Sequence, residues 1–301
     1  MTLPRVIAGY RVLGRLARGR AVELFAARKR GGPIVCIKRL PPSFCDDVDL
    51  VARFDREMST ARQLRHPNIV AVHEHGEDDG HYFVMEHVNG TDLRRLIGQV
   101  GRLDPDLVAF FGAGVARAFV YLHHGDPRRS PRGPIVHCDV SPENVLIDRA
   151  GRVKLSDFGM ARVLPKTGAE TVTQSRGKLT YLSPEQWRGE KLGAKSDLFS
   201  LGLVLWQALV GTHPYAEGRP RHRLLHDWIG EGACTNRRRS VREAAPHAPR
   251  ALQEVIEGLL QPAERRIGRA ERVLSVLEAI APRNGQRRLG LLVRSAARQP
   301  S

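Results

Sequence analysis

The stretch His137–Gly159, which reads HCDVSPENVLIDRAGRVKLSDFG, constrains the fold of this chain more than any other segment. Its short apolar runs Val145–Ile147 and Val153–Leu155 are typical of two strands. The four residues 148–151 (Asp-Arg-Ala-Gly) between them predict a turn that joins the strands as a hairpin. The stretch therefore predicts a loop, a hairpin and a second loop in direct succession.

Three polar side chains flank this hairpin: Asp139 and Asn144 precede it, and Asp157 follows it. The predicted loops and hairpin would bring the three side chains to one edge. Two carboxylates and one carboxamide offer oxygen donors, which suit a Mg²⁺ ion shared with substrate phosphates. A chance assembly of these residues on a noncatalytic loop is the alternative, and the order and spacing of the residues argue against it.

Length and composition favour a folded chain with one large domain or two lobes. The sequence has 301 residues and 42% hydrophobic residues, which is enough for a sizeable core. It contains no run of eighteen apolar residues, and its start, MTLPRVIAGYRV, does not resemble a signal peptide. The four cysteines are scattered, without a CxxC pair, as is typical of reduced thiols. We therefore expect a cytoplasmic protein that does not span a membrane.

The chain is strongly basic, with 48 Lys and Arg against 32 Asp and Glu, a net charge of +16. Such a charge can attract nucleic acid, anionic lipid or acidic proteins. A genome that favours arginine explains it equally, because most of the basic residues are Arg. Since no nucleic-acid motif or aromatic-interleaved basic stripe accompanies the charge, we do not expect a nucleic-acid partner.

With these residues in place, the stretch resembles the catalytic loop and DFG motif of eukaryotic-type (Hanks-type) serine/threonine protein kinases, in a compact, bacterial-like form. The resemblance spans about Tyr10–Ile280. It implies an α+β fold of two lobes, with a β-rich N-lobe over 10–87 and a helical C-lobe over 88–281. The basic segment 282–301 lies outside this domain, and we expect a flexible or weakly helical tail there, or else a contact with an anionic partner.

The resemblance assigns a role to each catalytic residue. Asp139 orients the acceptor hydroxyl and receives its proton, and Asn144 and Asp157 bind the metal. Lys38 holds the α- and β-phosphates of ATP and pairs with Glu57. Because an unpaired buried ammonium is costly to desolvate, the residues themselves also predict an anionic partner for Lys38.

A second motif, Gly177–Glu185, resembles the segment that builds the platform for a peptide substrate. By this resemblance Thr180 touches the catalytic aspartate, and Glu185 pairs with a distant arginine, for which we predict Arg265. Asp197 opens an apolar helix and is expected to accept backbone hydrogen bonds from the catalytic loop.

The resemblance also implies an ATP pocket, with Met85 as gatekeeper at the end of a buried strand. ATP is the expected cofactor together with Mg²⁺, and Mn²⁺ is the alternative ion. The residues expected to line this pocket are Leu16, Gly19, Leu24, Cys36, Lys38, Met85, Glu86, Val88, Asp92 and Leu146.

Four of the departures from the family pattern bear on whether the chain is active. The glycine-rich loop retains only Gly19 and carries Val22 in place of its third glycine. Cys138 replaces the arginine that meets an activation-loop phosphate, and Ser141 replaces a lysine that neutralises the γ-phosphate. Ala17 replaces the first glycine of the loop. These departures keep open a pseudokinase that binds ATP as a scaffold.

The sequence thus predicts a serine/threonine protein kinase that acts on protein hydroxyls, including its own. A small-molecule phosphotransferase of the same fold is a further alternative. Residues 125–134 form a polar loop, read either as a docking or regulatory insertion or as inert. Residues 167–178 form the expected activation segment. We predict strands over 10–16, 22–27, 34–38 and 82–88, and helices over 49–64, 104–124, 196–206, 252–260 and 273–280.

Overall fold

The computed structural model describes residues 4–19, 21–124, 133–163, 179–215 and 238–298. The expected activation segment 167–178 and most of the loop 125–134 lie outside these residues. The chain divides into two compact units, Met1–Val88 with Asp157–Met160, and Asn89–Ser156 with Ala161–Ser301. This division falls one residue from the predicted lobe boundary, but it assigns Asp157–Met160 to the N-terminal unit and the basic tail to the C-terminal one.

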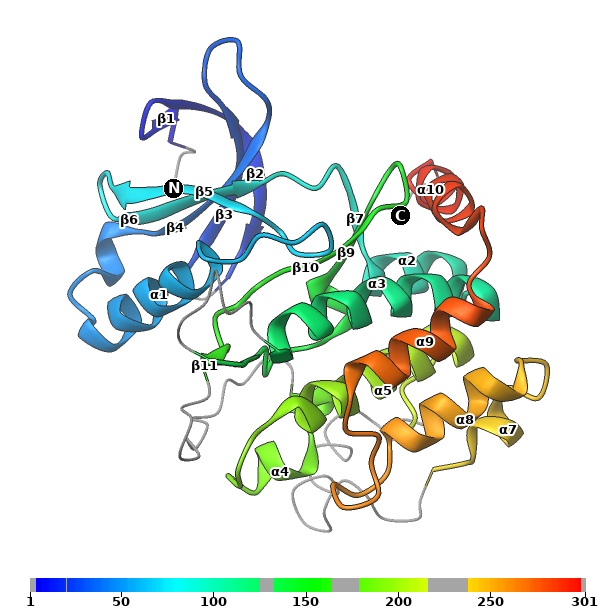
Figure 1. Cartoon of the computed structure of the whole chain (residues 1–301). Helices are drawn as coiled ribbons and strands as arrows, with labels where there is room; N and C mark the ends of the chain where they lie inside the picture. The colour runs from blue at the N-terminus through cyan, green and yellow to red at the C-terminus, as the bar shows by residue number, and fades with distance from the viewer. Residues whose placement is uncertain (1–3, 20, 125–132, 164–178, 216–237, 299–301) are drawn as a thin grey trace. The chain divides into compact units, whose positions relative to one another are not determined.

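The N-terminal unit is a six-stranded antiparallel sheet with one long helix (Figure 1). The strand order is β1-β2-β3-β4-β6-β5. The strands are β1 (Val6–Ile7), β2 (Tyr10–Arg18), β3 (Glu23–Arg28), β4 (Val35–Leu40), β5 (Val72–Glu77) and β6 (His81–Glu86). A 3-10 turn (Pro42–Phe44) precedes helix α1 (Val48–Ala61), whose N-terminus is capped by the side chain of Asp47 accepting from the amide of Leu50 at 3.0 Å.

The register of this sheet separates a core face from a face that carries Lys38. Residues directly opposite each other in a sheet point to the same side, and successive residues alternate. Leu24 lies opposite Lys38, and Cys36 lies opposite Met85, so these four side chains share one face. The other face packs into a hydrophobic cluster of Ile7, Tyr10, Phe25, Ala27, Val35, Ile37 and Val84. The register thus places the predicted pocket residues Leu24, Cys36, Lys38 and Met85 on one side of the sheet, whereas Glu86 lies opposite Val35 on the other.

The C-terminal unit is mainly helical. Its helices are α2 (Leu93–Val100), α3 (Pro105–His124), α4 (Pro184–Trp187), α5 (Ala194–Val210), α7 (Val241–Ala244), α8 (Arg250–Leu259), α9 (Ala270–Ile280) and α10 (Gly285–Ala296). Helix α5 is buried along nearly its whole length, as its continuous apolar sequence predicts. Helix α3 is long and apolar enough to cross a membrane by length and composition, but 67% of its apolar 18-residue stretch is buried inside the protein. We describe α3 as a core helix.

Short strands hold the predicted hairpin in this unit. Strands β9 (Val145–Asp148) and β10 (Val153–Leu155) pair antiparallel as expected, and β7 (Gly90–Asp92) adds a third strand beside β9. Strand β8 (Ile135–Val136) pairs with β11 (Arg162–Val163). The unit also contains two 3-10 turns, Pro142–Asn144 and Leu179–Tyr181.

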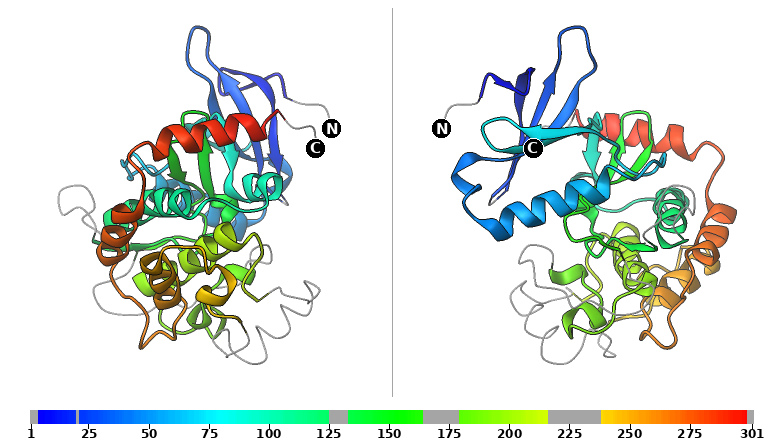
Figure 2. Two further views of the ribbon diagram at one scale, coloured as in Figure 1. Left: turned by 90° about the vertical axis from the view of Figure 1, so that its right-hand side faces the viewer. Right: turned by 60° about the vertical axis from the view of Figure 1, so that its left-hand side comes forward.

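The prediction of a flexible or weakly helical tail was wrong, because α10 is a helix with a buried face. Figure 2 shows α10 alongside the β9–β10 hairpin, and it also contacts α2 and α3. Leu289, Val293 and Ala296 are buried. These three residues recur at the spacing of one helix face, a pattern that the surrounding arginines masked. Each of the two larger side chains contributes about 1.5–3 kcal/mol by burial.

Glycines allow α10 to approach the hairpin turn backbone to backbone. Gly151 has a φ of +84°, and a Cβ atom there would lie 1.8 Å from the carbonyl oxygen of Gln286. On the helix side, a Cβ atom at Gly290 would lie 2.9 Å from the carbonyl oxygen of Arg149. Since a larger residue would collide at either position, α10 is an integral part of the C-terminal unit.

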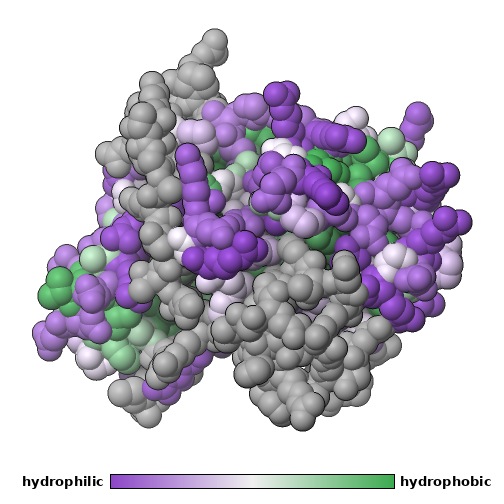
Figure 3. Space-filling view, turned by 90° about the horizontal axis from the view of Figure 1, so that it is seen from below, coloured by the Kyte–Doolittle hydropathy of each residue, from purple (hydrophilic) through white to green (hydrophobic). Residues whose placement is uncertain are grey.

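Figure 3 shows one face on which hydrophilic residues predominate over scattered hydrophobic ones. This agrees with the arginine-rich composition of the chain.

Candidate active site

Lys38, Glu57 and Asp157 form a charged cluster in the N-terminal unit. The Lys38 ammonium donates to Glu57 Oε1 and, at 3.2 Å, to Asp157 Oδ1. The expected ion pair between Lys38 and Glu57 is therefore present, and α1 supplies the glutamate from the side of the sheet that carries Lys38. The contact with Asp157, 119 residues further along the chain, was not predicted.

The cluster contains two carboxylates and one ammonium group. Their mutual interactions shift the pKa values of Lys38 and Glu57. Burial alone would lower the pKa of Lys38, but Asp157 and Glu57 outweigh it and raise the pKa above its ordinary value. Burial raises the pKa of Glu57 to about 7, against the opposing effect of Lys38 and with a further rise from Asp157. Lys38 is thus charged at any physiological pH.

The backbone around Asp157 is arranged for this contact. Asp157 has a φ of +65°, in the left-handed region that costs a non-glycine residue about 1–2 kcal/mol. Gly159 follows closely, and a Cβ atom there would lie 3.1 Å from Glu57 Oε2. Glycine at this position therefore lets the chain pass beside the carboxylate of Glu57.

The catalytic loop in the C-terminal unit brings Asp139 and Asn144 together, as the sequence predicted. The Asn144 amide donates to the carbonyl oxygen of Asp139 at 2.6 Å and to Asp139 Oδ2 at 3.1 Å. The carbonyl oxygen of Asn144 accepts from the amide of Ser156 at 2.9 Å, which ties the loop to the end of the hairpin. Both side chains are thereby fixed relative to each other.

Asp197 anchors the residues just before Asp139. Its carboxylate accepts the amide of His137 at 2.8 Å and the amide of Cys138 at 2.9 Å, which confirms the predicted backbone hydrogen bonds. A third partner, His123 Nε2 from α3, lies 2.9 Å from Asp197 Oδ2 and was not predicted. All of these groups are buried, where charge-assisted hydrogen bonds are strongest.

Cys36 and Cys138 are the two buried cysteines of the described residues. Burial raises the pKa of the Cys36 thiol to about 12. Burial also raises the pKa of Cys138 well above its ordinary value, and Asp197 adds to the effect. Since only the thiolate is nucleophilic, both residues act here as small apolar side chains.

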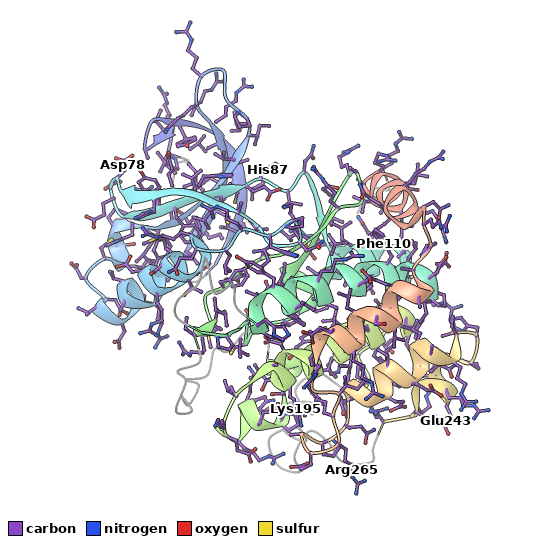
Figure 4. All side chains as sticks on the ribbon, viewed as in Figure 1. Asp78, His87, Phe110, Lys195, Glu243 and Arg265 are labelled. Atoms are coloured by element: carbon purple, nitrogen blue, oxygen red, sulfur yellow. The ribbon has the colours of Figure 1, made fainter. Side chains whose placement is uncertain are left out.

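The buried ion pair of Glu185 is made with Arg266, and the prediction of Arg265 was wrong. Arg266 Nη1 lies 2.6 Å from Glu185 Oε1, and Nη2 lies 3.2 Å from Oε2. Burial would raise the pKa of Glu185, but Arg266 outweighs it and holds the pKa below its usual range. Arg265 is exposed at the edge of the unit (Figure 4). A backbone turn that starts at Pro262 directs the second arginine inward, and the one-residue offset follows from this turn.

The turn Leu179–Tyr181 is held by α5 and by His213. His213 Nε2 lies 2.9 Å from the carbonyl oxygen of Thr180, so this nitrogen carries the proton. Ser200 Oγ donates to the carbonyl oxygen of Tyr181 at 2.7 Å. The predicted contact between the Thr180 side chain and Asp139 stays a prediction.

His213 should make the stability of the protein pH-dependent. Burial lowers the pKa of His213 to about 4, against the opposing hydrogen bond to Thr180. The native state therefore binds fewer protons than the unfolded state between pH 4 and about 6.5, so stability is complete above pH 6.5 and falls as pH decreases towards 4. The expected loss approaches roughly 3 kcal/mol in the free energy of unfolding below pH 4, and about 2 kcal/mol of it falls between pH 7 and pH 5. Denaturant titrations at pH 7 and pH 5 should show it, and H213Q should remove most of this difference; an unchanged pH slope in H213Q would contradict the assignment.

The predicted nucleotide-pocket residues are distributed over both units. In the N-terminal unit, Leu16 lies exposed on β2, and the Gly19 amide donates to the carbonyl oxygen of Val22 at 2.8 Å, which closes a tight turn. The Glu86 amide donates to the carbonyl oxygen of Ala71 at 2.8 Å. Val88 ends the unit.

In the C-terminal unit, two further pocket residues face each other across paired strands. Leu146 on β9 lies opposite Asp92 on β7 and is half-buried. Asp92 also caps α2, because its carboxylate accepts the amide of Arg95 at 2.9 Å. The predicted interaction of Asp92 with a ribose stays a prediction.

The donors available for a metal are oxygen atoms. Among the described residues, no group of three or more His, Cys, Asp and Glu side chains is placed to hold a metal ion. Asp157 contributes a partly exposed carboxylate in one unit, and Asn144 contributes a carboxamide in the other. These hard ligands fit Mg²⁺, which usually takes one or two protein ligands and completes its shell with phosphates and water.

Comparison with known proteins agrees with this geometry. Residues 10–276 match the protein kinase domain, and the chain belongs to this family. The chain is 38% identical to the probable serine/threonine-protein kinase SCO3848 of Streptomyces coelicolor over 230 residues, 73% of this chain and 33% of that protein. It is 38% identical to PrkC of Bacillus subtilis over 182 residues, 60% of this chain and 27% of PrkC.

A third relative shows the same partial coverage. PknB of Mycolicibacterium smegmatis is 37% identical over 231 residues, 73% of this chain and 35% of PknB. The chain therefore spans about a third of the length of the curated relatives it matches. Helix α10 begins after the matched residues 10–276 end.

Proposed function

We propose that this chain is a serine/threonine protein kinase that transfers the γ-phosphoryl group of ATP to protein hydroxyls. The observation that carries the proposal is the catalytic loop, in which Asn144 bonds Asp139 and Asp197 holds the two preceding amides. The names of the relatives, all serine/threonine-protein kinases, support the choice of acceptor.

The charged cluster of the N-terminal unit and the Asp139–Asn144 pair of the C-terminal unit would each carry out part of the reaction. Asp139 would orient the acceptor hydroxyl and accept its proton while the new oxygen–phosphorus bond forms and the bond to the β-phosphate oxygen breaks. Lys38, charged and held by Glu57, would bind the α- and β-phosphates. Asn144 and Asp157 would hold Mg²⁺, or Mn²⁺ as the alternative, and the ion would neutralise phosphate charge when bound. Catalysis then consists mainly of positioning and electrostatic stabilisation.

The departures from the family pattern leave this machinery in place. Ser141 is buried and cannot replace the charge of a lysine, so we expect slower transfer than in a kinase with lysine there. Cys138 removes the arginine that would meet an activation-loop phosphate, so switching by that contact is not expected. The retained Lys38–Glu57 and Asp139–Asn144 pairs argue against the pseudokinase alternative.

The substrate platform supports a protein acceptor over a small molecule. The turn Leu179–Tyr181 is fixed by His213 and Ser200, and α4 follows it directly. A rigid surface next to the catalytic loop suits an extended peptide. We therefore propose protein substrates with Ser or Thr acceptors, the chain itself included, in signalling by protein phosphorylation.

We also propose that this domain works in the cytoplasm. ATP is abundant there, and the described cysteines, including the buried Cys36 and Cys138, are unpaired. Such thiols persist in a reducing compartment.

A transfer assay tests the proposed function. Incubation with γ-labelled ATP, Mg²⁺ and a generic basic protein should label serine or threonine residues, which phosphoamino-acid analysis identifies. Chelation of divalent ions should abolish labelling, and added Mg²⁺ should restore it, because the phosphates cannot be neutralised without the ion. ATP binding without any labelling would favour the pseudokinase, and labelling of small molecules alone would favour the small-molecule phosphotransferase.

A further inference from the structure

Cys138, which directly precedes Asp139, has a left-handed backbone conformation, which is unfavourable for a residue with a Cβ atom. Its φ is +63°, in the left-handed region that costs a residue with a side chain about 1–2 kcal/mol. The amide of Cys138 donates to Asp197 Oδ1 at 2.9 Å. Its carbonyl belongs to the peptide unit that ends at the Cα atom of Asp139. Whatever fixes this carbonyl therefore helps to fix the orientation of the Asp139 side chain.

The group that fixes this carbonyl is Gln186, from α4. Gln186 Nε2 donates to the carbonyl oxygen of Cys138 at 2.8 Å. Its Oε1 accepts the amide of Ser183 at 3.0 Å and the hydroxyl of Ser183 at 3.2 Å. Since Ser183 offers donors and Cys138 offers an acceptor, the partners define which way the amide points.

Both the Nε2 and the Oε1 atom of Gln186 form hydrogen bonds, and the side chain is buried. Gln186 is 4% exposed, and Ser183 is fully buried. The side chain spans from the N-terminus of α4, which belongs to the predicted substrate platform, to the catalytic loop, which lies about fifty residues earlier in the sequence. Hydrogen bonds in such a dry environment are directional and costly to leave unmade.

We propose that Gln186 is a positioning residue for phosphoryl transfer, which holds the Cys138–Asp139 peptide and couples the substrate platform to the catalytic aspartate. The proposal rests on the proposed kinase function. Gln186 reaches the reacting groups only through Asp139, so its loss should lower kcat and leave KM for ATP unchanged. A displacement of about 1 Å at a catalytic group is enough to slow a reaction about 10²-fold.

The substitution Q186E gives this proposal a test that depends on pH. The glutamate retains an oxygen for the amide of Ser183. In its ionised form it has no proton for the carbonyl oxygen of Cys138 and repels it, whereas in its protonated form it can donate as the amide does. We expect kcat of Q186E relative to wild type to fall about tenfold or more at pH 8 and to recover largely at pH 6. Q186L should lose activity to the same extent at both values.

Gln253 provides the matched control. It is a buried glutamine of α8 whose Nε2 donates to the carbonyl oxygens of Ala245 and Ala248, each at 3.0 Å. Q253E introduces the same charge into an equivalent bond away from the catalytic loop. Its kcat per folded molecule should match wild type at pH 6 and pH 8. Equal pH trends for the two glutamate variants, or full activity of Q186E at pH 8, would overturn the proposal.

Amide hydrogen exchange separates this proposal from the proposed function. Residues 137–144 should exchange faster in Q186E and Q186L than in wild type or Q253E, because the loop loses its anchor. Unchanged exchange in the two Gln186 variants would overturn the proposal. A wild type that transfers no phosphoryl group would refute the kinase function, and exchange would still decide whether Gln186 holds the loop.

Discussion

Replacing Asp139 by asparagine is expected to reduce kcat for phosphoryl transfer by about 10²–10⁴-fold, the usual contribution of a general base. Asparagine has nearly the same size and retains an oxygen that can accept the bond now made by the Asn144 amide at 3.1 Å. The loop should therefore keep its shape, and ATP affinity should not change. What is lost is the negative charge that receives the proton of the acceptor hydroxyl. Steady-state kinetics with labelled ATP, together with calorimetric ATP titration, measures both quantities.

Asp104 offers a control for the change of charge. Its exposed carboxylate pairs with Arg288 at 3.1 Å near the start of α3, and it takes no part in the catalytic loop. D104N should transfer phosphate at the rate of wild type. If D139N retained more than half of the wild-type rate, Asp139 would not be the base. Equal labelling by wild type and D139N would instead point to a contaminating kinase.

Much of the fold follows from patterns that are local in the sequence. The hairpin β9–β10 was predicted from two apolar runs and a turn, and α3 from a long apolar periodicity. Helix α10 was missed because its arginines dominate the composition of the tail, although the spacing of Leu289 and Val293 could have revealed it.

The candidate site likewise contains contacts that the sequence predicted and contacts that it did not. The resemblance placed Lys38, Glu57, Asp139 and Asn144, and their pairwise contacts are present. The bond from Lys38 to Asp157 and the bond from Gln186 to the carbonyl of Cys138 join distant segments through geometry that no local pattern encodes. The choice between Arg265 and Arg266 depended on the course of a single turn.

Replacing Arg266 by methionine is expected to lower the free energy of unfolding of the C-terminal unit by about 3–5 kcal/mol. Arg266 is 4% exposed, and the change would leave the buried carboxylate of Glu185 without its charge partner. It would also remove the donors that now reach the carbonyl oxygens of Gln261 and Lys195, each at 2.9 Å. Urea unfolding followed by tryptophan fluorescence, to which the buried Trp206 contributes, should report the loss.

The neighbouring Arg265 is the matched control, since R265M makes the same chemical change at an exposed position and should alter stability by less than about 0.5 kcal/mol. A larger loss for R265M than for R266M would contradict the assignment of the ion pair. The double variant E185M/R266M decides what the pair contributes, because removing both charges spares the cost of an unpaired buried carboxylate. We expect it to be more stable than R266M alone. Such a result would show that the penalty in R266M arises mainly from the unpaired carboxylate of Glu185, and that the ion pair serves to orient α4, and with it Gln186, more than to stabilise the fold.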